Sequence, residues 1–347
     1  MTMIGIVYHK DYNKYDLGLA HPLVGDKPRK TMEFFKEKSI LKDVQVFSPS
    51  RATDQDLLRV HSERYVQQIH KLSETGGMLA LDTPAPKGIY EIACLATGGS
   101  ILAGEKLFEG YTIMANPLGG FHHAGKETSS GFCFFNDIAV TIEYLRKHRD
   151  LERFFILDLD VHHSNGTQDI YARDPTVLNV SFHQDGRTLY PGTGKIDYIG
   201  RDDGEGYTIN LPLPPGTGSE AVKYAFKTLI PPLVEQFNPQ IILYQSGVDT
   251  HHSDPLADLS LSHQTYHHLA GNVRQLSKKS CDKLLVLFGG GYNSNESIYS
   301  YYNIMCGLLK RSDYIQEEDT TKLQKYEKIK ELVSNLKIIL GPYWSFE

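Results

Sequence analysis

The sequence predicts an α/β fold built on a mostly parallel sheet. Apolar runs of strand length recur along the chain and alternate with longer segments of helical periodicity, which is the pattern of repeated βαβ units. The 347 residues, of which 40% are hydrophobic, are enough to bury a large core. No internal repeat or low-complexity linker divides the chain, so we expect one domain and not two.

Six apolar runs are predicted as strands: residues 4–8, 111–115, 154–157, 177–182, 241–244 and 284–288. Helix start signals precede three segments, with Asp26 and Pro28 before residues 31–35, Thr53 and Asp56 around Leu57, and Ser262 before residues 264–276. Residues 88–108 are also predicted as a helix, in which Gly98 and Gly99 indicate close packing on the sheet.

The composition becomes charged after about Arg311, and apolar residues recur at helical spacing over residues 323–340. We therefore predict a domain over residues 1–310 and a C-terminal helical extension over residues 311–347 that packs on the same domain.

Charge and cysteine usage narrow the class of protein. The formal net charge of -6 argues against general nucleic-acid binding, which needs clustered Lys and Arg, and it favours a basic partner such as a Lys-rich peptide or a polyamine. The cysteines have no CxxC spacing, which fits a reducing compartment; they are Cys94, Cys133, Cys281 and Cys306. The chain has no run of about 18 apolar residues and no apolar leader, so we expect a cytoplasmic protein without a membrane span.

A run of acidic and imidazole side chains follows the predicted strand 154–157. Alternation in an extended chain turns Asp158, Asp160 and His162 to one side, and carboxylate oxygen and imidazole nitrogen are both ligands of Zn²⁺. Asp249, which follows the strand 241–244, is the best candidate for a third ligand, although one Asp in that place is also common as a turn or cap residue. The donor set favours a catalytic over a structural zinc site, and Fe²⁺ fits it equally well.

Two further loops follow predicted strands and carry groups suited to acid/base and oxyanion chemistry. His122 and His123 come after the turn Gly119-Gly120, and tandem histidines can supply both a general base and a general acid. Tyr292 follows the run 289–291 of three glycines and can donate a hydrogen bond to an oxyanion. Each pattern alone is also typical of an ordinary polar loop.

Six motifs in this order, GGFHHA, SSGFCFFND, DLDVHHSNGTQ, SFHQDGRTLYPGTG, GVDTHHSDPLADLSLS and FGGGYN, resemble the histone deacetylase and acetylpolyamine amidohydrolase family. The similarity extends from near the N-terminus to about Leu309. The resemblance implies the arginase/deacetylase fold, a single α/β domain with a central, mostly parallel sheet of eight strands flanked by helices.

The resemblance also implies roles for individual residues. It makes Asp160, His162 and Asp249 the metal ligands. The other catalytic positions it implies are the histidine dyad, the polarising tyrosine and the partners of the two histidines: His122, His123, Tyr292, Asp158 for His122 and Asn165 for His123. Asn165 stands where many eukaryotic class I members of the family have Asp, and it resembles other branches of the family in this position; an Asn orients an imidazole without adding charge.

The family further implies structural K⁺ sites and a substrate channel. One potassium site would match Asp158, Asp160, His162, Ser181 and Phe182, and a second would match Tyr171, Asp174, Val177 and Tyr207. The channel for an acylated lysine would be formed by Gly131, Phe132 and Tyr190, with Leu256 where an acidic gatekeeper is expected in polyamine-specific members and Asp82 at the rim.

The function predicted in this way is removal of acetyl or other acyl groups from the side-chain amine of lysine in proteins or peptides, by metal-activated water with the His dyad as acid and base. Deacetylation of acetylpolyamines or of small acylated amine metabolites is the alternative within the class. A non-catalytic acyl-lysine-binding protein is the alternative from another class. An arginase-like enzyme with two Mn²⁺ ions would need bridging carboxylates in DxHxD and DxDxxD patterns, and neither pattern is complete here.

Overall fold

The computed structural model describes residues 3–18 and 21–346. Eight strands are hydrogen-bonded in the order β2-β1-β5-β10-β9-β6-β7-β8, and β3 (Gly77–Ala80) pairs with β4 (Thr83–Ala85) in a separate antiparallel hairpin. The predicted α/β fold class, an eight-stranded parallel sheet with flanking helices, is confirmed. The chain forms two compact units that interleave along the sequence.

The first unit comprises Met1–Glu152, Ser164–Ile170 and Leu285–Gly289. Its strands β1 (Ile4–Val7), β2 (Gln45–Phe47) and β5 (Ile113–Asn116) pair in parallel, with β1 between the other two. The α-helices of this unit are α1 (Lys27–Glu37), α2 (Asp54–Leu57), α3 (Glu63–Thr75), α4 (Ile89–Lys106), α5 (Asp137–Arg149) and most of α6 (Asn165–Tyr171).

Helix α4 is almost entirely buried, and its two central glycines allow neighbouring segments to approach it closely. A Cβ at Gly98 would lie 2.0 Å from the backbone oxygen of Ser50, and a Cβ at Gly99 would lie 2.0 Å from the hydroxyl of Tyr12. The predicted close packing on the sheet is confirmed, since α4 contacts β1 and β5. Gly98 also lies against the 50–52 loop, and Gly99 against a 3-10 helix, η1 (Lys10–Lys14). The side chain of Asn116, the last residue of β5, also approaches Gly99.

The second unit comprises Arg153–His163, Tyr171–Leu284 and Gly290–Glu347. Its strands are parallel wherever they pair, and they are β6 (Phe154–Asp158), β7 (Val177–Gln184), β8 (Thr208–Leu213) and β9 (Ile241–Gln245). The helices of this unit are α7 (Ser219–Phe237), α8 (His263–Ser280), α9 (Glu296–Leu309) and α10 (Tyr326–Leu340), while β10 (Leu284–Leu287) begins in this unit and ends in the first.

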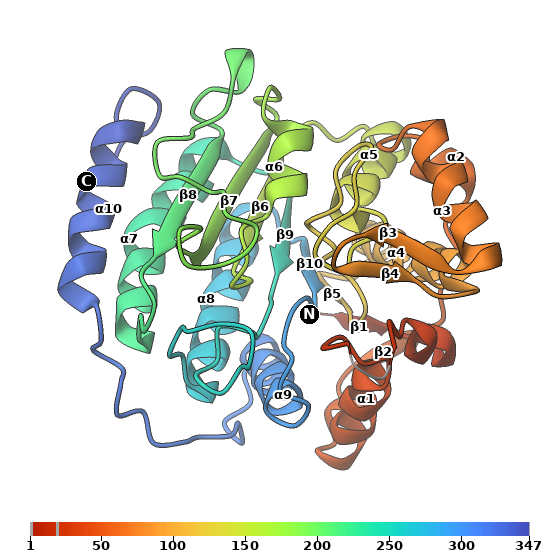
Figure 1. Ribbon diagram of the computed structural model, residues 1–347. Coiled ribbons are helices and arrows are strands. Elements are labelled where there is room, and N and C mark those ends of the chain that lie inside the picture. The colour runs from red at the N-terminus through yellow and green to blue at the C-terminus, as the bar shows by residue number, and fades with distance from the viewer. Residues whose placement is uncertain (1–2, 19–20, 347) are drawn as a thin grey trace. The chain divides into compact units, whose positions relative to one another are not determined.

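The predicted C-terminal helix exists as α10, which packs against α7 and β8 within the second unit (Figure 1). Its buried residues recur at helical spacing as Ile329, Val333, Leu336 and Leu340. Among residues 3–18 and 21–346, no helix combines the length and the apolar character that a membrane crossing requires. The boundary at residues 310 and 311 stays a prediction.

Candidate metal centre and histidine pair

Three buried side chains of the second unit converge at the carboxyl ends of β6 and β9. Nδ1 of His162 lies 3.1 Å from Oδ1 of Asp160 and 3.1 Å from Oδ2 of Asp249. One donor atom from each residue lies within 4.8 Å of the other two, and the side chains of Asp160 and Asp249 are 3% and 0% exposed. The structure therefore brings the three residues predicted as metal ligands together.

Two glycines allow the backbone to approach these carboxylates. A Cβ at Gly290 would lie 2.0 Å from Oδ2 of Asp249, and a Cβ at Gly247 would lie 2.4 Å from Oδ2 of Asp160. Gly290 N–H instead donates a hydrogen bond of 2.9 Å to Asp160, and the side chain of Gln245 donates another of 3.0 Å to the same oxygen. The two hydrogen bonds fix the carboxylate of Asp160. A larger residue at either glycine would displace this carboxylate.

The electrostatics of the three donors fit a cation. Burial and the nearby charge of Asp160 raise the pKa of Asp249 to about 7. Burial opposes a charged His162, but hydrogen bonds with Asp160 and Asp249 outweigh it and raise the pKa of this imidazole to about 10. Two buried carboxylates this close together favour positive charge between them, and a divalent cation held by oxygen and nitrogen donors would supply it.

Two tyrosines flank this donor set. The ring centroids of Tyr190 and Tyr292 each lie 6.3 Å from that of His162. Tyr292 N–H donates a hydrogen bond of 2.7 Å to Oδ2 of Asp254, and Leu256 N–H donates one of 3.0 Å to the other oxygen of the same carboxylate. Asp254 thus holds two predicted site residues in place, although no sequence pattern predicted a role for it.

The tandem histidines lie in the first unit and are buried. Nε2 of His122 is 3.2 Å from Nε2 of His123, and Nδ1 of His123 is 2.6 Å from Oδ1 of Asn165. Since an amide oxygen only accepts hydrogen bonds, the Nδ1 of His123 carries a proton, and its Nε2 has the lone pair in the neutral ring. This is the tautomer that a general base acting through Nε2 requires. Asp158, the other predicted partner, lies in the second unit at the end of β6.

The turn that presents the histidines is held by Asp137, for which no role was predicted. Its carboxylate accepts hydrogen bonds from Gly120 N–H at 3.1 Å and from Phe121 N–H at 2.8 Å, and it is bonded to the hydroxyl of Ser100. Burial raises the pKa of Asp137, while these donors act in the opposite direction. The residue lies within the quoted motif SSGFCFFND, so a search for a buried acid at the start of α5 could have found it.

Three of the predicted channel residues also meet within the first unit. Gly131 has φ +55, and a Cβ there would lie 2.0 Å from Cδ2 of His123. Its N–H donates a hydrogen bond of 2.9 Å to Oδ2 of Asp82, and Phe132 N–H donates one of 3.1 Å to the hydroxyl of Thr83. Asp82 therefore orders the Gly131-Phe132 turn; its predicted contact with substrate stays a prediction.

The potassium positions lie in the second unit. Ser181 is paired with Asp158 across β6 and β7, and its hydroxyl is 2.8 Å from Nδ1 of His183. In the other set, Tyr171 C=O accepts from Asp174 N–H, and Asp174 C=O accepts from Val177 N–H, while Tyr207 C=O accepts a hydrogen bond from the β7 backbone. Each carbonyl oxygen has a second lone pair, so these hydrogen bonds do not prevent the same oxygens from binding K⁺. Both sites stay predictions.

Comparison with known proteins defines the class. Residues 21–308 match the model of the histone deacetylase domain. The chain therefore belongs to this family of deacetylases and amidohydrolases, which is generally metal-dependent.

Individual relatives carry related names. The chain is 34% identical to a probable deacetylase of Archaeoglobus fulgidus over 98% of both chains. It is 38% identical to a histone deacetylase-like amidohydrolase of Pseudomonas aeruginosa, over 76% of this chain and 69% of the relative. It is 32% identical to the acetoin utilization protein AcuC of Bacillus subtilis, over 83% of this chain and 77% of that relative. The crystal structure of the HDA15 HD domain superposes with a TM-score of 0.87 at 25% identity, covering 99% of this chain and 95% of that chain.

Proposed function

We propose that this chain is a zinc-dependent amidohydrolase that removes acetyl or other acyl groups from the side-chain amine of lysine in proteins or peptides. The observation that carries the proposal is the buried set Asp160, His162 and Asp249, in a chain that belongs to the histone deacetylase family. Fe²⁺ suits the same donors and is the alternative metal, and K⁺ is proposed as a structural ion.

The proposed mechanism assigns a step to each of the chain's own groups. A divalent cation at the three ligands would act as a Lewis acid on the acyl carbonyl and would lower the pKa of water. Nε2 of His123 would take the proton from the attacking water and return it to the departing amine, with His122 assisting electrostatically. The hydroxyl of Tyr292 would donate a hydrogen bond to the oxyanion of the tetrahedral intermediate.

Asn165→Ala is expected to lower kcat by about 10–100-fold, the usual cost of losing an orienting partner, and to change KM little. The variant removes the acceptor that fixes the Nδ1 proton of His123, so the ring loses its productive tautomer. Asn165→Asp, which restores an acceptor, should recover most of kcat. Steady-state kinetics of the three proteins test this role, and equal kcat for Asn165→Ala and the wild type would contradict it.

Leu256 stands where an acidic gatekeeper is expected in polyamine-specific members, and this favours a lysine side chain over a polyamine as substrate. Leu256 offers no charge to a distal amine, and its backbone is held by Asp254. The net charge of -6 suits a lysine-rich peptide. A relative named acetoin utilization protein keeps small acylated metabolites as the second candidate substrate class.

The proposed activity is tested with purified protein loaded with Zn²⁺ or Fe²⁺. We expect turnover of a fluorogenic acetyl-lysine peptide and a higher kcat/KM for acyl-lysine peptides than for acetylpolyamines. A preference for acetylpolyamines or small acylated amines would move the assignment to the alternative substrate class. Stoichiometric metal with no turnover of any acylated amine would instead favour a non-catalytic acyl-lysine-binding protein.

A further inference from the structure

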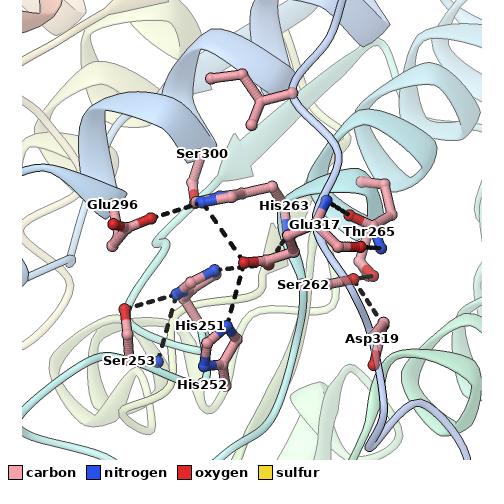
Figure 2. A network of polar contacts seen from close by, with 12 residues as sticks. His251, His252, Ser253, Ser262, His263, Thr265, Glu296, Ser300, Glu317 and Asp319 are labelled. Carbon is pink, nitrogen blue, oxygen red and sulfur yellow. Dashed lines mark hydrogen bonds and ion pairs between the residues drawn. The ribbon is translucent and has the colours of Figure 1, made fainter.

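A second group of histidines and acids lies in the second unit, outside the site described above. Figure 2 shows three histidine rings arranged around the carboxylate of Glu317, with Glu296 on the far side of His263. The side chains of His251 and His263 are each 3% exposed, whereas that of His252 is 47% exposed. Two overlapping sets have one donor atom per residue within 4.8 Å: His251 with His263 and Glu296, and His251 with His252 and Glu317.

The buried imidazoles of His251 and His263 lie against each other. Their rings stack with centroids 4.2 Å apart and planes at 22°. Nδ1 of His251 is 2.8 Å from the hydroxyl of Ser253, and Nδ1 of His263 is 2.9 Å from the hydroxyl of Ser300. The hydroxyl of Ser300 can accept the Nδ1 proton of His263, which leaves Nε2 of this ring as the ligating atom. Nδ1 of His251 is also 3.3 Å from the backbone N–H of Ser253, which donates to it, so ligation through Nε2 of His251 requires its proton to shift to Nδ1 and to be accepted by the Ser253 hydroxyl.

Both Nε2 atoms face carboxylates. Nε2 of His251 is 2.9 Å from Oε1 of Glu317, and Nε2 of His263 is 2.7 Å from Oε2 of Glu296 and 3.9 Å from Oε2 of Glu317. Bonds of about 2.0–2.1 Å in a tetrahedron place neighbouring ligand atoms about 3.3 Å apart. The spacings of these three pairs bracket that value, and Glu296 and Glu317, which belong to different donor sets, would have to move toward each other to share one ion.

The charges of this group of histidines and acids suit a divalent cation. Burial, followed by the proximity of His251, lowers the pKa of His263 and favours its neutral, metal-binding form. Burial works against the charge of Glu317, but hydrogen bonds from His251 and from the backbone of His263 lower the pKa of this acid to about 2. With both imidazoles neutral, the carboxylates of Glu296 and Glu317 would carry negative charge that a divalent ion would neutralise.

We propose that His251, His263, Glu296 and Glu317 form a second site, which binds a divalent transition-metal ion of the zinc class. Four protein ligands without an open position are typical of a structural ion. The exposed His252 is not a ligand in this assignment.

The ion would connect four segments of the second unit: the loop after β9, the starts of α8 and α9, and the connection from α9 to α10. Glu317 lies in the segment that leads from α9 to α10, and its carboxylate already accepts a hydrogen bond of 2.7 Å from the N–H of the first residue of α8, His263. Ser253, which holds His251, also accepts hydrogen bonds of 3.1–3.2 Å from the side chain of Asn293, next to Tyr292. Binding would therefore stiffen the 249–254 loop, which also carries Asp249 and Asp254.

Metal analysis of zinc-loaded, desalted protein tests the second site without using activity. We expect about two zinc ions per chain in the wild type, about one in Asp249→Ala, and about one in the double variant Glu296→Gln and Glu317→Gln, which is nearly isosteric. His263→Ala should also lose one ion. The matched controls are His252→Ala and His70→Ala, since His70 is an exposed histidine beside Glu74; both should keep about two ions.

Thermal unfolding with and without zinc identifies any variant that has failed to fold. The number of zinc ions per chain is compared only among the folded variants. Zinc should raise the Tm of Asp249→Ala, in which only the second site can bind it, and should not raise it when the two Glu→Gln changes are added. About one ion per chain in the wild type and none in Asp249→Ala would overturn the proposal. Loss of the second ion in His252→Ala, together with its retention in the double Gln variant, would overturn the ligand assignment.

Discussion

Tyr292→Phe is expected to bind as much metal as the wild type and to lose about 10²–10³-fold in kcat, the usual cost of removing one hydrogen-bond donor to an oxyanion. The phenyl ring keeps the edge-to-face contact with His162, whose ring centroid is 6.3 Å away. The backbone of residue 292 keeps its hydrogen bond to Asp254. Only the hydroxyl is lost, so the defect should lie in the chemical step and leave the metal ligands unaffected.

Metal content and steady-state kinetics of Tyr292→Phe test this role together. Tyr343→Phe is a matched control, because it removes a hydroxyl of the same unit that is bonded to Glu205 near the C-terminus. The control should retain wild-type kcat. Wild-type turnover by Tyr292→Phe would exclude the hydroxyl as the oxyanion donor, and loss of metal from this variant would show that its defect is structural.

The six strands predicted from apolar runs all exist, and the two main-sheet strands without a sequence prediction are those at the edges. β2 is only three residues long and mostly exposed, so it has no apolar run. β8 reads TINLPL, in which Pro212 argues against a central strand. The structure pairs β8 with β7 alone, and an edge strand tolerates a residue that lacks a backbone donor.

The side chains that offer donors to metal were easier to predict than those that hold them in place. Asp160 and His162 follow from alternation after a strand, whereas Asp249 depended on the family resemblance. Asp137, Asp254 and Gln245 act through hydrogen bonds to distant backbone or side-chain groups. Sequence spacing carries no trace of these bonds, because their partners lie 16 to 85 residues away.

The histidine doublets illustrate the same difficulty. His122-His123 and His251-His252 look alike in sequence, and the predicted dyad was favoured by its place after a strand and two glycines. The structure separates them by their partners, since His123 faces an amide in Asn165 while His251 faces the carboxylate of Glu317. The charge of Glu317, 66 residues further along the chain, makes the second doublet part of a cation site in our proposal.

Asp249→Asn is expected to lower zinc affinity by more than about 100-fold, because loss of an outer hydrogen-bonding partner alone costs up to that amount. The amide keeps the volume of the carboxylate and can still accept the hydrogen bond of 3.0 Å from Val161 N–H. It removes the charge that, with Asp160, raises the pKa of His162. The remaining donors are one carboxylate and one imidazole, too few for the three protein ligands of a catalytic zinc site.

Deacylase activity of Asp249→Asn should fall in proportion to the ion lost from this site, and excess zinc should restore part of it. Asp258→Asn is the matched control, because Asp258 is an exposed residue of the same loop whose backbone N–H is bonded to Gln184. Zinc affinities of the two variants are compared by competition with a chelator. Wild-type affinity in Asp249→Asn would remove this residue from the ligand set and leave Asp160 and His162 in need of another partner.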